Sequence, residues 1–141
     1  MKQALSAVTL GTRDLERARG FYEALGWSVH TDTEETLFFQ ANGLAFVLWD
    51  RAKLAADSGV ADAGGWGGIT LAHNVGSPAE VDELLAAARA AGGEVTTAAA
   101  ETSWGGYHGA FTDPEGHAWE IAHNPFWTLR EDGSTDLEAP A

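Results

Sequence analysis

Side chains able to do acid–base chemistry lie in two short stretches of the 141-residue chain. Tyr107 and His108 are neighbours in a glycine-rich stretch that is predicted to be a strand. Only one of the two can point into a given cavity, because side chains alternate along a strand. His73 lies at the end of another predicted strand, where a histidine acts as a base, binds a metal or is simply structural. We expect one ligand contact from the first pair and leave the three roles of His73 open.

The chain has six tryptophans, which is more than the core of so small a protein needs. Trp66 and Trp104 lie in glycine-rich loops, where an aromatic ring can close over a ligand. Phe39, Phe46 and Trp49 lie on predicted strands. We expect these five residues to line a ligand cavity, with packing in the core or at a dimer interface as the alternative for each of them.

The composition excludes several classes of function. Eight basic and 21 acidic side chains give a net charge of −13, which would repel a nucleic-acid backbone. The absence of cysteine excludes disulfides and thiolate metal sites. The sequence has no apolar run near the roughly 20 residues of a membrane span, and its N-terminus does not resemble a signal peptide. We therefore expect a cytoplasmic protein with neither nucleic-acid nor membrane partners.

The elements that would position these residues are predicted twice, 66 positions apart, with Gly26 and Gly92 ending the two helices. The first copy has a strand at 5–11, a helix at 15–25 and β segments at 27–31, 36–41 and 44–50. The second copy has a strand at 69–72, a helix over 81–91 and β segments at 94–97, 106–111 and 117–122. Each half therefore follows the order βαβββ.

This repeat predicts an α+β fold in which two βαβββ modules form a curved, partly open mixed β-barrel with a ligand cavity on its concave side. We expect one domain over residues 1–125. Its modules span about residues 4–58 and 66–124, joined by a glycine-rich linker. Residues 126–141 are acidic and small, and we expect them to form a C-terminal tail.

Two segments resemble motifs of the vicinal oxygen chelate superfamily, which includes glyoxalase I, extradiol dioxygenases, fosfomycin-resistance transferases and bleomycin-resistance proteins. The segment DLERARGFYEALG at 14–26 is similar to the first helix of that family, and DPEGHAWEI at 113–121 is similar to its closing strand. The resemblance spans about residues 4–124 and implies the glyoxalase/bleomycin-resistance fold. It indicates the reaction only weakly, because many chemistries use this scaffold.

Catalytic members of the resembled family hold one divalent metal ion with two His and two Glu, or with a His-His-Glu triad. In this chain the corresponding positions fall on Ala7, on the apolar stretch 46–48, on either Gly68 or His73 depending on the register of the fifth strand, and on Glu120. One or two ligands are too few for a catalytic metal site. The resemblance therefore implies that this member has lost the metal, and that Glu120 acts as a base or binds a cationic group.

The leading hypothesis is a metal-independent homodimer that binds an apolar, aromatic or cationic metabolite or antibiotic in an aromatic-lined cavity. The alternative is a glyoxalase- or dioxygenase-like enzyme, namely a lyase, isomerase or oxygenase, with a reduced metal site. It would hold Fe, Mn, Ni or Zn with His73 and Glu120, or catalyse without metal through Glu120 and Tyr107 or His108. A third hypothesis is that the ligand is a partner protein, which aromatic residues such as Trp127 would contact.

Overall fold

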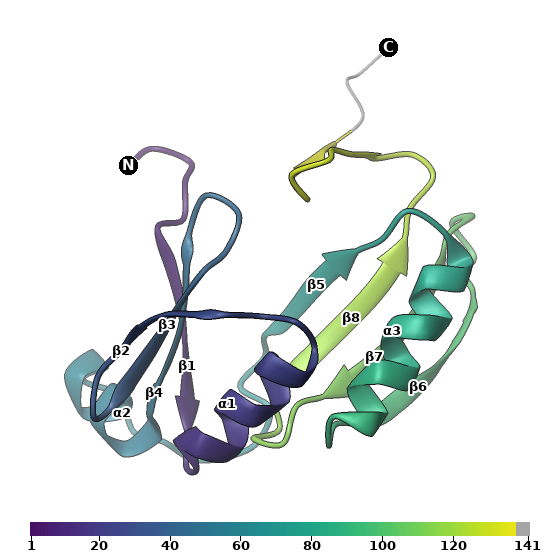
Figure 1. The fold of residues 1–141 in the computed structure, drawn as a ribbon. Helices are drawn as coiled ribbons and strands as arrows, with labels where there is room; N and C mark the ends of the chain where they lie inside the picture. The colour runs from purple at the N-terminus through teal and green to yellow at the C-terminus, as the bar shows by residue number, and fades with distance from the viewer. Residues whose placement is uncertain (138–141) are drawn as a thin grey trace. The chain divides into compact units, whose positions relative to one another are not determined.

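The computed structural model describes residues 1–137 and divides into two compact units. Unit 1 is Met1–Gly67 and unit 2 is Gly68–Ala141. Each unit contains a strand, a helix and three further strands in that order, and the four strands form one mixed sheet. The predicted α+β class and the two βαβββ modules are therefore confirmed (Figure 1).

Unit 1 has six elements, which are β1 (Ala7–Thr12), α1 (Leu15–Ala24), β2 (Val29–Asp32), β3 (Thr36–Gln40), β4 (Ala45–Asp50) and α2 (Arg51–Ser58). The strand order is β1-β4-β3-β2, with β1 parallel to β4 and the other pairs antiparallel. Helix α1 begins after Asp14, whose side chain accepts the Arg17 N–H at 3.0 Å and caps the first turn.

The core of unit 1 is a cluster of aromatic rings between α1 and the sheet. The Tyr22 ring of α1 lies 5.1 Å from the Phe46 ring and 6.0 Å from the Phe39 ring. Trp27 approaches Phe46 to 5.0 Å. Tyr22, Phe39 and Phe46 are each no more than 3% exposed. Burial of such large apolar surfaces, with edge-to-face ring contacts, is what fixes α1 on this sheet.

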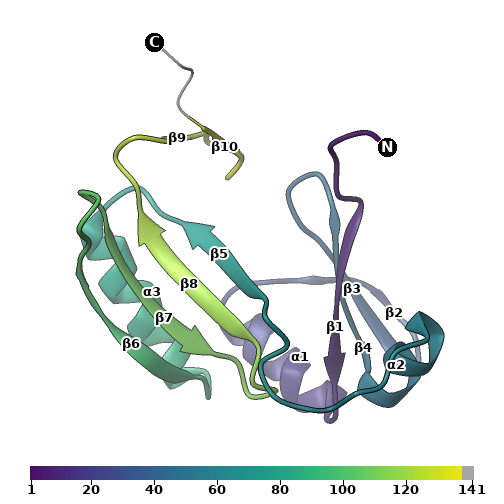
Figure 2. The ribbon, with the colours of Figure 1, turned by 180° about the vertical axis from the view of Figure 1, so that it is seen from behind.

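Unit 2 contains β5 (Thr70–Asn74), α3 (Pro78–Ala90), β6 (Glu94–Glu101), β7 (Tyr107–Thr112), β8 (Ala118–His123), β9 (Thr128–Leu129) and β10 (Thr135–Asp136). The main sheet has the order β5-β8-β7-β6, and α3 covers one of its faces (Figure 2). The short antiparallel pair β9–β10 lies within the stretch 126–141 that the sequence predicts as a tail. Residues 138–141 of that tail lie outside the described residues.

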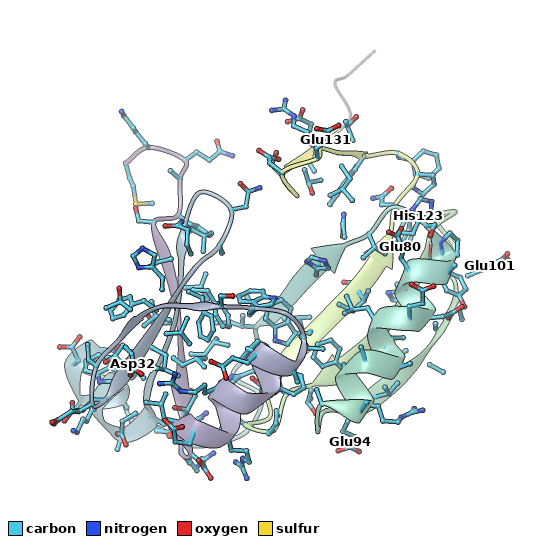
Figure 3. All side chains as sticks on the ribbon, viewed as in Figure 1. Asp32, Glu80, Glu94, Glu101, His123 and Glu131 are labelled. Atoms are coloured by element: carbon cyan, nitrogen blue, oxygen red, sulfur yellow. The ribbon has the colours of Figure 1, made fainter. Side chains whose placement is uncertain are left out.

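The side chain of Ser77 caps the start of α3. The Ser77 hydroxyl accepts the Glu80 N–H at 3.3 Å and donates to Glu80 Oε2 at 3.0 Å, with Pro78 in the first turn. Figure 3 shows Glu80 at this end of the helix. Across residues 1–137, no helix combines the length and the apolarity that crossing a bilayer would demand.

We expect Ser77→Ala to lower the free energy of unfolding by about 1 kcal/mol, because the Glu80 N–H of the first turn loses its acceptor. Urea denaturation followed by circular dichroism measures the loss. Ser58→Ala, at the exposed end of α2, serves as the control and should cost less than about 0.5 kcal/mol. Equal losses in the two variants would contradict the capping role.

Candidate functional site

Contacts with α3 distinguish the two faces of the unit 2 sheet. The Tyr107 hydroxyl donates a hydrogen bond to Asp82 Oδ1 of α3 at 2.8 Å. A Cβ atom added at Gly109 would lie 2.4 Å from a methyl group of Leu85, also in α3. Tyr107 and Gly109 therefore face α3, and His108 between them faces the other way. We name this opposite side the face away from α3; it carries His108, Ala110, Glu120 and Ala72.

His108 and Glu120 form a hydrogen-bonded pair on the face away from α3. The register of β7 and β8 pairs Ala110 with Glu120 and places His108 one step along the same face. His108 Nδ1 lies 3.0 Å from Glu120 Oε1. The two side chains are 38% and 36% exposed, so a dissolved molecule can reach both.

This contact fixes which nitrogen of the imidazole is available. An ionised carboxylate has no hydrogen to give, so Glu120 accepts and Nδ1 of His108 donates. In the neutral ring Nε2 then carries the lone pair, which can accept a proton or a hydrogen bond. No other described residue hydrogen-bonds the His108 ring. The pair thus combines an oriented base with the carboxylate that holds it in place.

Removing the Glu120 carboxylate should change which nitrogen of the His108 ring carries the hydrogen. We expect Glu120→Ala to increase the fraction of neutral His108 that carries its hydrogen on Nε2, because the acceptor for Nδ1–H is lost. Long-range ¹H–¹⁵N NMR of the ring nitrogens measures the tautomer directly. Glu101→Ala is the control, since Glu101 pairs with Tyr107 and belongs to the other face. An unchanged tautomer in Glu120→Ala would contradict the assigned donor.

The structure does not bring Tyr107 or His73 to this pair. The hydrogen bond to Asp82 raises the pKa of Tyr107, which keeps the phenol protonated and unsuited to act as a base. His73 pairs with Ile121, a buried residue of β8, and therefore lies on the α3 side of the sheet. The β5 residue beside Glu120 is Ala72, so neither Gly68 nor His73 occupies the position considered for a fifth-strand ligand.

The residues around Glu120 in unit 2 offer few ligands for a divalent metal ion. Within residues 1–137 there is no group of three or more His, Asp or Glu side chains that could hold one ion. Ala72 and Ala110 flank Glu120 on the neighbouring strands and offer no donor atom. His108 and Glu120 supply two donors, whereas zinc and similar ions take at least three from the protein. The site of His73 and Glu120 considered from the sequence is also unsupported, because their side chains lie on opposite faces.

Phe39 and Phe46 are buried core residues of unit 1, and both rings pack against Tyr22. This burial favours the alternative of core packing for both residues, although Phe39 also lines the pocket described next. Trp49 lies on β4 opposite Thr36 of β3, three residues after Phe46. It therefore points to the other face of the sheet, away from α1, and is half-buried there. Trp66 is 65% exposed and lies in the linker before β5.

A shallow pocket of about 230 Å³ lies on the β2–β4 part of unit 1 and is lined by His30, Thr31, Phe38, Phe39, Gln40 and Ala45. Of these residues only Phe39 is expected from the sequence, and its ring is almost wholly buried. Phe38 is the pocket-lining aromatic that sequence reasoning missed. The consecutive apolar residues Leu37, Phe38 and Phe39 hide the alternation that would have separated it from the core.

Trp104 lies in the loop between β6 and β7, and its ring rests on the neighbouring backbone. A Cβ atom added at Gly106 would lie 2.0 Å from Trp104 Cη2, so the indole fills the place of the missing side chain. Phe126 packs in the same way near Gly105, at 3.3 Å from the added Cβ. Trp104 remains 44% exposed. The glycines of this loop pointed to Trp104 in the sequence, whereas no sequence signal pointed to the packing of Phe126 near Gly105.

The family model of the glyoxalase/bleomycin resistance protein/dioxygenase superfamily matches residues 4–121. The chain belongs to this superfamily. Among solved structures, a glyoxalase-related enzyme from Fulvimarina pelagi is 40% identical, with a TM-score of 0.92 over 98% of this chain and 100% of that one. No curated protein matches the chain.

More distant members of the superfamily share the fold alone. A lactoylglutathione lyase from Agrobacterium tumefaciens is 23% identical, with a TM-score of 0.66 over 87% of this chain and 95% of that one. A fosfomycin resistance protein from Mesorhizobium loti is 17% identical, with a TM-score of 0.66 over 88% and 94%. These proteins have different names but share one fold, so the fold alone does not assign a function to this chain.

Proposed function

We propose that this superfamily member binds a small organic molecule, without a resident metal ion, on the face away from α3. The hydrogen-bonded pair of His108 and Glu120 is the observation that carries the proposal. It is a half-exposed polar group set among alanines: Ala72 and Ala110 lie beside Glu120, and Ala122 lies beside His108. Small neighbours leave room for a ligand, and a few convergent polar atoms on an apolar surface are typical of binding sites.

Two further expectations belong to this proposal. The resemblance to drug-binding members of the superfamily supports a homodimer, and the sequence supports a cytoplasmic location. Size-exclusion chromatography with light scattering tests the first: a mass near twice 14.9 kDa is expected, and a monomer at micromolar concentration would contradict it. Neither expectation is needed for His108 and Glu120 to bind a ligand.

Binding can be tested with a panel of small aromatic, cationic and neutral compounds, measured by thermal shift and tryptophan fluorescence. At least one compound should raise the melting temperature of the wild type, because a ligand that binds only the folded state stabilises it. His108→Ala should lose this shift, and Glu101→Ala, at an exposed position on the other face of the same sheet, should retain it. A panel without any effect, or equal shifts in both variants, would contradict the proposal.

Acid–base catalysis without metal is the second candidate, and the same contact favours it. A histidine whose Nδ1–H is held by a carboxylate is well placed to remove a proton through Nε2. The 40% identical relative from Fulvimarina pelagi is described as an enzyme. The simplest reaction within reach of a single base is removal of a proton from a carbon next to a carbonyl, followed by its return.

Proton abstraction would be visible as hydrogen–deuterium exchange. Carbonyl compounds from the panel are incubated with the protein in D₂O containing a chelator, and loss of the α-proton signal is followed by NMR. Catalysis predicts exchange above the buffer rate that disappears in His108→Ala and persists in Glu101→Ala. A panel that binds but shows no exchange would leave binding as the function and exclude this second candidate for those compounds.

A further inference from the structure

The loop between β6 and β7 holds Trp104 in a defined place. The Gly106 N–H donates to Thr102 Oγ1 at 2.9 Å, and the Thr102 N–H donates back to the Gly106 carbonyl at 2.9 Å. The Gly105 N–H also donates to the Thr102 carbonyl at 3.2 Å. A loop closed by three hydrogen bonds has few alternative conformations, so the indole does not need to be ordered when a ligand arrives.

The position of Gly106 indicates which face the indole covers. Gly106 directly precedes β7 and lies two residues before His108, and residues two apart in extended backbone point to the same side. The missing Gly106 side chain would therefore project from the face away from α3, and the Trp104 ring occupies that place. At a rise of about 3.3 Å per residue, Gly106 and His108 lie about 7 Å apart along the backbone, and the Trp104 ring lies over Gly106. A flat molecule can span this distance.

The charge of the surrounding sheet has one sign. Strands β5 to β8 contain no Lys or Arg, and their ionisable acids are Glu94, Glu101 and Glu120. Figure 3 shows Glu94 and Glu101 at opposite ends of β6. On the face away from α3, the hydrogen-bonded pair offers acceptors, namely Nε2 of neutral His108 and the carboxylate of Glu120. These four strands therefore offer no Lys or Arg to an anionic ligand.

We propose that Trp104 is the stacking wall of this site, and that the site selects planar organic cations with N–H donors, such as aryl amidines, over planar anions of the same size. The selection rests on the proposed binding function. An aromatic cation stacks on the indole, which attracts positive charge through its π face. Its N–H groups donate to Glu120 and to His108, as hydrogen bonds between charged partners do most strongly. An anion of the same shape is repelled by Glu120.

Benzamidine and benzoate form a matched pair of probes, equal in shape and opposite in charge. Their dissociation constants are measured by ¹H–¹⁵N NMR titration of the tryptophan indole N–H signals at one pH and salt concentration. We expect benzamidine to bind at least about 10-fold more tightly than benzoate, and to shift the Trp104 signal most. Glu120→Gln should bring the two dissociation constants together, because it removes the charge and retains the side-chain volume.

The stacking role of Trp104 is tested by comparing the variant Trp104→Ala with the control variant Trp127→Ala. Both tryptophans belong to unit 2 and have nearly the same exposure, 44% and 43%. We expect Trp104→Ala to weaken benzamidine binding about 10-fold and Trp127→Ala to change it less than twofold. Thermal unfolding of both variants shows that they are folded.

Three results would overturn this inference: benzoate binding as tightly as benzamidine, unchanged benzamidine affinity in Trp104→Ala, or no binding of benzamidine at all. The proposed function fails separately, when no compound of the wider panel binds in a manner that depends on His108. Binding of a neutral or anionic compound that is lost in His108→Ala would keep the proposed function and remove the selection for cations.

Discussion

Phe39→Ala is expected to lower the free energy of unfolding by about 3–5 kcal/mol, as truncation of a buried phenylalanine does. The Phe39 ring is 1% exposed and lies 5.8 Å from the Trp27 ring and 6.0 Å from the Tyr22 and Phe46 rings. Alanine would leave a cavity between α1 and the sheet that these large rings cannot close. Urea denaturation followed by circular dichroism measures the difference.

Phe38→Ala is the matched control for this variant. Phe38 is the adjacent residue of β3, is only half-buried, and points to the opposite face of the sheet, where it lines the shallow pocket. Its truncation should cost less than half as much as that of Phe39, because less apolar surface leaves water on folding. Equal losses would mean that α1 does not pack on the face assigned to it, and that Phe39 could again be considered as a ligand contact.

Gly106→Ala should have the second largest effect, and it should act on both stability and binding. The new Cβ would lie 2.0 Å from the Trp104 ring and 2.9 Å from the His123 carbonyl oxygen, so both neighbours must move. Overpacking of this kind costs about 1–3 kcal/mol. The displaced indole should also weaken benzamidine binding. Urea denaturation measures the first effect, and NMR titration of the indole signals measures the second.

Gly20→Ala is the contrasting control for Gly106→Ala. Gly20 lies at an exposed position within α1, and a Cβ there would meet no heavy atom within 4 Å. Alanine should therefore stabilise the protein by about 0.5–1 kcal/mol through its higher helix propensity. If Gly106→Ala were as harmless as Gly20→Ala, the Trp104 ring would not be seated on Gly106.

The elements of the fold could be predicted from the sequence because their signals are local. The helix predicted at 15–25 is observed at Leu15–Ala24, and the one predicted at 81–91 is observed at Pro78–Ala90. Ser77 caps the second helix and Asp14 caps the first, and both are residue types typical of this position. Apolar spacing, capping residues and terminal glycines all act within one or two turns of chain. The motifs at both ends of the chain also indicated the superfamily correctly.

The faces of the strands could not be predicted, because they depend on partners far away in the sequence. Alternation shows that Tyr107 and His108 point in opposite directions, but the contacts of Tyr107 with Asp82 and of Gly109 with Leu85 are needed to show which of them faces the helix. The contact of His108 with Glu120 requires the register of β7 against β8. That register follows the turn after β7, where Asp113 accepts the N–H groups of Glu115 and His117 at 2.9 Å each.

The most direct test of metal-independent binding at His108 and Glu120 is a calorimetric titration of the tightest panel compound in the presence of EDTA. It is repeated after removal of EDTA and addition of one equivalent of Fe²⁺, Mn²⁺, Ni²⁺ or Zn²⁺. We predict one dissociation constant in all conditions, raised at least about 10-fold by His108→Ala. Binding that appears only after an ion is added would contradict the account.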